Sequence, residues 1–341
     1  MSSQLTLEDK QAILTETLPL KEAKHIVKEP KYGNSIPKNI LRRMGKVCRM
    51  GSRTALQTIE ESKTGFDAVI VGSGYGDMSQ CYRFLEQVIA YDEGSLTPTN
   101  FVNASPNILA GTIALGQQNR GYNSTHFQKG TAFYNSLFDA LIQMEFGTNN
   151  NIIVGGADEI SDYYYRIQNL IKPFRTETPT IESYYNAKEV GFIPGETSVF
   201  FGLSKEKQEE SVCKISQMDT RFELDEADFT NWVQEFIENG PISLDQIDTI
   251  ITGENGCSDD RQFYSLFQNE FDEVNNYRFK HFVGESPNAI GFAIWLACFD
   301  VEFGKLPSHF VHKRVKEESK YYLLYNHYSS SYHQLVLVEK A

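Results

Sequence analysis

The sequence predicts an α/β fold, and three of its features lead to that prediction. Several short runs are continuously apolar, and each is followed by glycine; they are Phe66–Val71, Asn151–Val154 and Ile247–Thr252. Runs without polar alternation are typical of strands buried on both faces of an α/β sheet. Helix-like segments lie between the runs. A chain of 341 residues with 40% apolar residues suits one large domain or two packed halves.

The longer periodic segments are predicted to be helices, and the chain is predicted to end in a strand pair. The expected helices are Lys38–Ser62, Thr131–Phe146, Leu224–Glu238, Asp259–Phe271 and Asn288–Phe303. The final pair of strands is expected at Tyr321–Tyr325 and Gln334–Glu339, around a polar turn.

A short internal repeat suggests that the domain is duplicated. Asp67–Gly72 and Asp248–Gly253 share an aspartate, an apolar run and a glycine in the same order. With the similar order of strands and helices around them, this predicts two halves joined within Ile171–Lys188. We place the halves at 1–175 and 176–341.

Charge and cysteine content limit the kinds of partner and location. Thirty-two basic and 45 acidic residues give a net charge of −13, which argues against nucleic acid or an anionic membrane as a partner. The longest apolar run, Ala289–Phe299, is about half the roughly 20 residues that a membrane span needs. The acidic N-terminus does not resemble a signal peptide, and the five scattered cysteines indicate free thiols, so we expect a cytoplasmic protein.

The segment Asn107–Glu159 carries the most specific pattern. It shows Asn-x-x-Ala-Gly, an Arg-Gly turn, a strand, a sharp turn near Gly130, a long helix, and Gly-Gly-Ala-Asp-Glu. Its fixed points are Asn107, Ala110, Gly111, Arg120, Gly121, Gly147, Gly155 and Gly156. This pattern resembles the β-ketoacyl-acyl-carrier-protein synthases. The resemblance implies the thiolase-like fold, in which two similar βαβαβ halves form a five-layered αβαβα architecture.

Three further segments extend the resemblance over residues 38–341. Arg42-Arg43-Met44 resembles a helix of the family, Gly191–Ser204 its Gly-Glu strand, and Lys280–Gly284 its approach to a catalytic histidine. The first strand of the family is not recognisable within Met1–Tyr32.

The catalytic side chains that the resemblance implies are missing. A ketosynthase uses a cysteine activated at a helix start, two histidines and a glycine-rich loop that supplies an oxyanion N–H. Gly130 stands at the nucleophile position, Gly253 or Glu254 at the first histidine, and Glu285 at the second. The loop is replaced by Ser329, Ser330 and Ser331, before Tyr332. We therefore expect no catalytic residues, no cofactor and no metal.

Three other residues are candidate substitutes for the missing catalytic side chains. His126 is interpreted as a packed or interface histidine rather than a base. Cys257 is a candidate displaced nucleophile, although a buried thiol is the commoner case. Glu285 could be a general base if its pKa is raised, or an exposed glutamate at a helix start.

Several remaining motifs have ordinary structural interpretations. Glu254, Asp259 and Asp260 are interpreted as acids at a helix N-terminus rather than metal ligands. Gly72–Gly76 lacks the third glycine of a dinucleotide-binding turn. The basic cluster is a solvated helix face or a contact for an acidic carrier protein; its members are Arg42, Arg43, Lys46 and Arg49.

A ketosynthase fold without its nucleophile resembles the chain-length factors, which pair with an active ketosynthase. We place this chain with the short ketosynthase-like proteins of aryl-polyene and flexirubin-type pigment pathways. The resemblance puts the dimer contact along Tyr122–Lys129, where the inactive subunit caps the acyl pocket of its partner. The expected interface and capping residues are Phe101, Asn103, Ser105, Tyr122, Ser124, His126 and Phe133.

Two alternatives to this interpretation stay open. One is an acyltransferase of the same fold that uses non-standard residues, and the other is a homodimer that holds acyl chains without reacting. The partner is accordingly an active ketosynthase or a second copy of the chain, with acyl-carrier protein as a further candidate.

Overall fold

The computed structural model describes residues 23–30, 32, 35–171, 174–186 and 190–341. The chain forms two compact units. Unit 1 consists of Ile26–Lys172 and Gly195–Glu206, and unit 2 contains Pro173–Pro194 and Lys207–Ala341. The chain therefore crosses between the units more than once, because it returns to unit 1 after residue 194.

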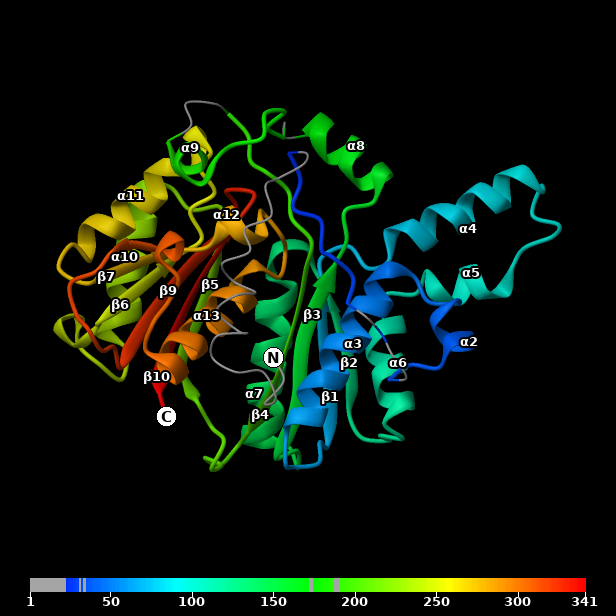
Figure 1. The fold of residues 1–341 in the computed structure, drawn as a ribbon, viewed down its shortest axis with the longest axis horizontal. Helices are drawn as coiled ribbons and strands as arrows, with labels where there is room; N and C mark the ends of the chain where they lie inside the picture. The colour runs from blue at the N-terminus through cyan, green and yellow to red at the C-terminus, as the bar shows by residue number, and fades with distance from the viewer. Residues whose placement is uncertain (1–22, 31, 33–34, 172–173, 187–189) are drawn as a thin grey trace. The chain divides into compact units, whose positions relative to one another are not determined.

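Unit 1 is built on a four-stranded sheet with the order β2-β1-β3-β4 (Figure 1). The strands are β1 (Ala68–Ser73), β2 (Asn123–Phe127), β3 (Asn151–Asp158) and β4 (Thr197–Ser204). β1 pairs in parallel with β2 and β3, whereas β4 runs antiparallel to β3. The parallel strands are β1–β3, and β1 and most of β3 are fully buried, as their continuous apolar runs predicted.

Helices pack on both faces of this sheet. α3 (Lys46–Glu61) and α6 (Ile108–Gly116) contact the face that carries Val69, Val71 and Ile153. α7 (Ala132–Phe146) contacts β1, β2 and β3. Because successive side chains of a strand alternate between faces, Ile70 and Val154 lie on the α7 side.

The single helix predicted over Lys38–Ser62 is two helices, α2 (Lys38–Leu41) and α3, and that part of the prediction is wrong. Gly45 lies between them in an extended conformation as the N-cap of α3. A Cβ atom at Gly45 would lie 1.6 Å from a carboxylate oxygen of Asp77. Gly45 therefore permits a close approach to Asp77 that a residue with a side chain would not allow, and the helical periodicity does not show this approach.

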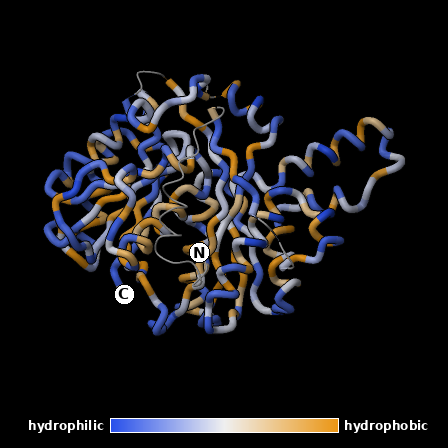
Figure 2. The backbone as a smooth tube through the Cα atoms, in the orientation of Figure 1, coloured by the Kyte–Doolittle hydropathy of each residue, from blue (hydrophilic) through white to orange (hydrophobic). Residues whose placement is uncertain are grey.

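Three helices of unit 1 lie away from the sheet core. They are α4 (Met78–Ala90), α5 (Pro98–Asn103) and α8 (Asp162–Ile171). The cyan helices α4 and α5 lie side by side and extend away from the sheet of their unit (Figure 1). Hydrophobic and hydrophilic residues are interspersed along this hairpin (Figure 2), and several of its apolar side chains are exposed.

Unit 2 is built on a six-stranded sheet with the order β5-β10-β9-β6-β7-β8. Its strands are β5 (Cys213–Phe222), β6 (Thr249–Thr252), β7 (Asn275–Arg278), β8 (Val311–Lys313), β9 (Tyr321–Tyr328) and β10 (Tyr332–Lys340). β6 is parallel to both β7 and β9, and the other pairs are antiparallel.

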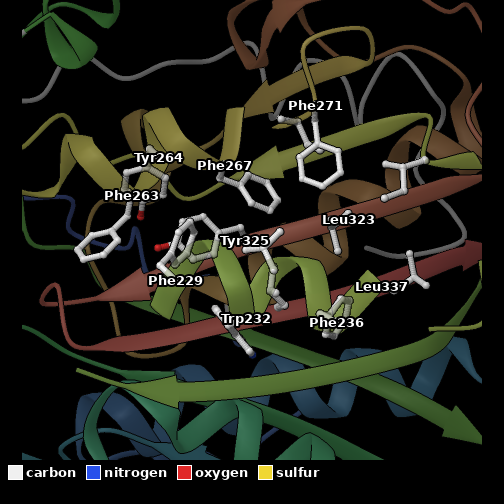
Figure 3. Packing of buried hydrophobic residues seen from close by; sticks show 14 of the residues in the cluster. Phe229, Trp232, Phe236, Phe263, Tyr264, Phe267, Phe271, Leu323, Tyr325 and Leu337 are labelled. Atoms are coloured by element: carbon white, nitrogen blue, oxygen red, sulfur yellow. The ribbon is translucent and has the colours of Figure 1, made fainter. Parts of the chain in front are cut away.

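An aromatic cluster forms the core between this sheet and two helices. α10 (Glu226–Glu238) and α11 (Arg261–Glu270) supply Phe229, Trp232 and Phe267, which pack against β9 and β10 (Figure 3). α13 (Ala289–Phe303), preceded by α12 (Lys280–Val283), contacts β6, β9 and β10. The short elements that remain are α9 (Ile181–Tyr185), η1 (Lys129–Thr131), η2 (Leu244–Gln246), η3 (Ser258–Asp260) and η4 (Ser308–Phe310).

The repeat seen in the sequence corresponds to the same local structure in both units. The carboxylate of Asp67 accepts hydrogen bonds from the backbone N–H groups of Asn150 and Asn151, at 2.8 and 3.0 Å. The carboxylate of Asp248 accepts bonds from Lys320 and Tyr321, at 2.9 and 3.2 Å. In each unit the aspartate thus anchors the start of the neighbouring parallel strand, β3 or β9.

Within the described part of the chain, no helix has the length and apolarity that a membrane crossing requires.

Candidate functional site

The turn between β2 and α7 holds the first expected site position. Gly130 is buried in η1, immediately before α7. Lys129 has a φ of +39°, a conformation that costs free energy in a non-glycine residue and is often found at functional turns. β1 lies very close to this turn, because a Cβ atom at Gly72 would lie 2.6 Å from backbone atoms of Ala132. The bend is tight and buried, and Gly130 supplies no reactive side-chain atom there.

The residues that follow Gly130 do not supply an activated nucleophile. Thr131 carries the hydroxyl closest in sequence, and it donates to the Gln128 carbonyl at 3.1 Å. Asn135 donates to the same hydroxyl at 3.3 Å. Neither a carbonyl nor an amide can act as a base toward the threonine. Phe133 is fully buried and packs edge-on against Phe201, so it fills the space beside the turn within unit 1.

The expected interface strand β2 is partly exposed along its length. His126 Nε2 lies 2.9 Å from a carboxylate oxygen of Asp139 on α7, and Tyr122 donates to the same carboxylate at 3.1 Å. These bonds support the interpretation of His126 as a packed histidine. Ser124 is partly buried, and Phe127 at the end of the strand is 49% exposed.

The three expected capping residues near α5 are placed differently. Phe101 is 64% exposed on the outer hairpin, where it packs against Phe84 of α4 with ring centroids 5.3 Å apart. Asn103 is buried, and its amide donates to the backbone carbonyl of Arg43. Ser105 is exposed just beyond the helix. Phe101 and Ser105 are thus accessible, whereas Asn103 holds α5 against unit 1.

The second expected site region lies at the ends of β6 and β9 in unit 2. Gly253 directly follows β6, and a Cβ atom there would lie 2.1 Å from the amide oxygen of Asn326. Asn326 is fully buried. The space that a side chain at residue 253 would need is therefore already taken by a residue of β9.

Glu285 belongs to a buried ion pair, so its interpretation as an exposed glutamate is wrong. Its carboxylate lies 2.7 Å from the Lys280 ammonium, and neither side chain has any exposed surface. Asn255 donates to the same carboxylate at 3.1 Å. Burial raises the pKa of Glu285 and lowers that of Lys280, and their mutual attraction opposes both shifts. Lys280 also donates to the backbone carbonyl of His327 at 3.4 Å.

The serine loop extends the same network. Ser329 and Ser330 have φ values of +52° and +63°, so the β9–β10 hairpin turns through left-handed residues before Ser331. The Ser330 hydroxyl donates to Asp260, which also accepts from Asn255 at 2.8 Å. Asn255 therefore bridges the serine loop and the Lys280–Glu285 pair.

The three acids after β6 have different surroundings, and two of them lie at a helix start. Asp260 is the N-cap residue of α11, but it is buried and its side chain does not cap that helix. Glu254 is buried and lies 2.9 Å from the Arg278 guanidinium. Asp259 is exposed. The prediction of helix N-terminal acids is confirmed for Asp259 and Asp260, which lie in the first turn of η3. It is wrong for Glu254, which lies before the helix, because the sequence does not show that Arg278 faces it.

Cys257 is buried, in keeping with the commoner interpretation of an unreactive thiol. Its sulfur accepts a hydrogen bond from the backbone of Gly191 at 3.3 Å. All five cysteines are free, as predicted.

The glycine turn after β1 is occupied by an acid of the chain itself. Asp158 accepts bonds from the backbone N–H groups of Gly74 and Tyr75 and from the Ser73 hydroxyl, at 3.1, 3.1 and 2.8 Å. These donors are the groups that a phosphate would need. Burial raises the pKa of Asp158 to about 7. The turn does not provide a dinucleotide site.

Two of the four basic residues in the predicted cluster form ion pairs with acidic residues of the same chain. Lys46 pairs with Glu196 at 2.5 Å, and Arg49 pairs with Glu29 at 2.7 Å. Arg42 and Arg43 are exposed. The surface available to an acidic partner is therefore narrower than the sequence indicated. Among the described residues, no group of three or more histidine, cysteine or acidic side chains could hold a metal ion.

The geometry defines the class of protein as a thiolase-like α/β fold. Residues 21–176 match the family model of the β-ketoacyl synthase N-terminal domain. The resemblance to the β-ketoacyl synthases is thereby confirmed for residues 21–176. No curated protein matches the sequence.

Solved structures share this fold at low sequence identity. A β-ketoacyl synthase from Burkholderia phymatum gives a TM-score of 0.76 at 14% identity, covering 92% of this chain and 86% of that one. The ishigamide ketosynthase/chain length factor gives 0.74 at 13%, with 92% and 87% covered. The ketosynthase ApeO in complex with its chain length factor ApeC, from Xenorhabdus doucetiae, gives 0.72 at 13%, with 92% and 85% covered. The predicted fold class is confirmed.

Proposed function

We propose that this chain is a non-catalytic ketosynthase-like subunit of the chain-length-factor type, which pairs with an active β-ketoacyl-ACP synthase. The observation that carries the proposal is the turn at Gly130. This turn keeps a strained residue, Lys129, and a buried helix start, but its central residue has no side chain. A thioester cannot be attacked without a nucleophile at that point.

The two histidine positions support the same proposal. Asn326 occupies the space beside Gly253, and Glu285 is held by Lys280 and Asn255. A buried carboxylate in an ion pair cannot provide the hydrogen bonds that two neutral histidines would give to a developing negative charge. These positions have thus become part of the packing of unit 2.

The outer edge of β2 supports a subunit interface. Within the described residues, β2 pairs with β1 on one side and with no strand on the other. An edge with unpaired backbone groups is suited to continuing a sheet into a second subunit. Phe127 adds exposed apolar surface at the end of this strand.

The α4–α5 hairpin is the element suited to reach a partner. Phe101 and Val102 are 64% and 53% exposed on α5, although both are large and apolar. An apolar side chain on an outward hairpin can block the end of an acyl pocket in a neighbouring subunit. We infer that Phe101 limits acyl-chain length in this way, in an aryl-polyene or related pigment pathway. Arg42 and Arg43 are the proposed contacts for an acidic acyl-carrier protein.

Co-expression with an intact ketosynthase tests pairing directly. The expected result is a stable one-to-one complex, and exchange of Phe101 for alanine is expected to lengthen the products of that complex. Asn103 is a poor choice for this test because it holds α5 in place, whereas Val102→Ala on the same exposed surface is a matched control. Failure of every cognate ketosynthase to co-purify would remove the pairing proposal.

Mass spectrometry after incubation with acyl thioesters tests the non-catalytic part. No acyl adduct is expected on this chain, while the active partner is labelled. The alternative, an enzyme that uses non-standard residues, predicts an adduct on Thr131 or Cys257. Its candidate residues are excluded if Thr131→Ala, Cys257→Ala, Glu285→Gln and His126→Ala all leave any observed turnover intact. The homodimeric acyl-binding alternative predicts that the isolated protein is a dimer that retains acyl ligands.

A further inference from the structure

The exposed side of α7 carries a stripe of large apolar side chains, Phe138, Ile142 and Phe146. They are 47%, 39% and 84% exposed. Because they are spaced by four residues, they lie on one side of the helix, whereas Phe133 and Leu137 are buried on another. A helix that packs against a single core normally presents polar residues on its exposed side, so α7 has a second apolar face. Contiguous exposed apolar surface is typical of a protein–protein contact.

The stripe lies next to β2 in unit 1. Asp139, which follows Phe138 in the helix, accepts a hydrogen bond from Tyr122 at 3.1 Å and lies 2.9 Å from His126 Nε2. Tyr122 directly precedes β2, and His126 belongs to it. Within the described residues, the outer edge of β2 pairs with no strand. The apolar stripe therefore continues the surface that begins at this uncovered edge.

The way in which β2 can pair determines where α7 would lie relative to a partner. Two equivalent strands that pair antiparallel through their outer edges are related by a two-fold axis perpendicular to the sheet. This rotation keeps equivalent faces of the two sheets on the same side, so the helices that cover them come side by side. Paired strands are about 4.8 Å apart and packed helices about 8–10 Å apart, so both contacts can form together.

We propose that Phe138, Ile142 and Phe146 pack against the equivalent helix of the active ketosynthase and form the apolar part of the subunit interface. This inference rests on the proposed pairing with that enzyme. Side chains four residues apart form the ridge that interdigitates in the commonest class of helix packing. A second copy of this chain is a less suitable occupant, because it would bring two net charges of −13 together.

Substitution within the stripe tests this contact in the complex with the ketosynthase. Ile142→Asp places an unpaired charge in an apolar contact and should raise the dissociation constant of the complex by about 100-fold. Ile167→Asp is the matched control on α8, because Ile167 is 45% exposed in the same unit and lies outside the stripe. It should bind as the wild-type chain does. Both variants should keep the melting temperature of the free chain, since both side chains are partly exposed there.

The outcomes separate this contact from the pairing itself. If the wild-type chain and Ile142→Asp bind the ketosynthase equally well, the α7 contact is wrong while the pairing stands. If the wild-type chain does not bind, the proposed function fails and the contact fails with it. Equal loss of binding in Ile142→Asp and Ile167→Asp would show that the effect is not specific to the stripe, and would also overturn the contact.

Photo-crosslinking identifies the surface that the stripe meets. In the complex formed by Phe138→p-benzoylphenylalanine, irradiation should link this chain to the ketosynthase helix that follows the nucleophile cysteine. Peptide mapping of the linked product locates the contact. A crosslink to another part of the ketosynthase, within one chain, or between two copies of this chain would overturn the proposal.

Discussion

The two units of this protein share one strand topology, but they differ in the cover of one sheet edge and in the charged residues near the strand ends. In each unit a central strand, β1 or β6, has parallel neighbours, followed by an antiparallel strand, β4 or β10. In unit 2 the strand equivalent to β2 is β7, and β8 covers its outer edge. Within the described residues, the outer edge of β2 has no such cover. The difference supports the proposal that β2 is the edge at which another chain pairs.

The strand ends differ as well. In unit 2 the buried Glu285 faces a lysine, and the buried Glu254 faces an arginine. In unit 1 the buried Asp77 lies beside Glu159, an acid of the same sign. The two units therefore carry very different sets of charged residues near the ends of their strands. Scaffold and catalytic chemistry are separable in this fold.

The largest expected effect comes from disrupting the uncovered edge. The backbone N–H of Val69 donates to Tyr122, so alternate residues of β2 face β1 and Thr125 faces outward. Thr125→Pro removes an outward N–H and should abolish co-purification with the ketosynthase. Thr125→Val keeps the N–H and should retain the complex. Equal recovery of the partner with both variants would show that β2 is not the contact.

Breaking the buried ion pair of unit 2 should be the most damaging change to stability. Lys280→Ala leaves Glu285 buried without its counter-charge and should lower the free energy of unfolding by about 3–5 kcal/mol, measured by urea denaturation. Lys320→Ala removes an exposed ion pair with Glu339 in the same unit and should change the free energy of unfolding far less. Similar losses for both variants would contradict the role assigned to burial.

The paired glycines of the repeat should respond differently to alanine. At Gly72 the added methyl group meets the backbone of Ala132, which cannot move aside, so a loss of about 2–3 kcal/mol is expected. At Gly253 it meets the Asn326 side chain, so a loss of about 1–2 kcal/mol is expected. Asn326→Ala should partly restore the stability of Gly253→Ala. No rescue would mean that Asn326 is not the obstacle.

The acid pair of unit 1 should make stability depend on pH. Burial, followed by the neighbouring Glu159, raises the pKa of Asp77 to about 7. A raised pKa means that the carboxyl stays protonated to a higher pH in the folded state than in the unfolded state. This contribution is complete below about pH 4 and is lost as the pH rises through 7.

Asp77→Asn should flatten that dependence and stabilise the protein at pH 8 by about 1–2 kcal/mol. The asparagine oxygen can still accept the bond that Asp77 takes from Gln80 at 3.3 Å. Thermal melts between pH 5 and 8 measure the effect, with Asp92→Asn at an exposed position as the control. An unchanged slope in Asp77→Asn would refute the assignment.

Sequence reasoning located most of the scaffold but few of its contacts. Continuous apolar runs predicted β1, β3 and β6, because a strand that is buried on both faces has apolar residues at successive positions. The polar strand β7 and the amphipathic helix α4 were not predicted, because their residues lack a clear apolar run. The segment Met1–Tyr32, in which the first strand of the family is not recognisable, lies mostly outside the described residues.

Local sequence by itself determined the class of fold, the duplicated Asp–strand–Gly units and the absence of a nucleophile at residue 130, because each depends on residue types close together in the chain. The tertiary structure alone decided that Asn326 fills the space at Gly253 and that Lys280 holds Glu285. A side chain's partner is set by which strands and helices come together. That pairing is a cooperative property of the whole sheet and is absent from any single segment.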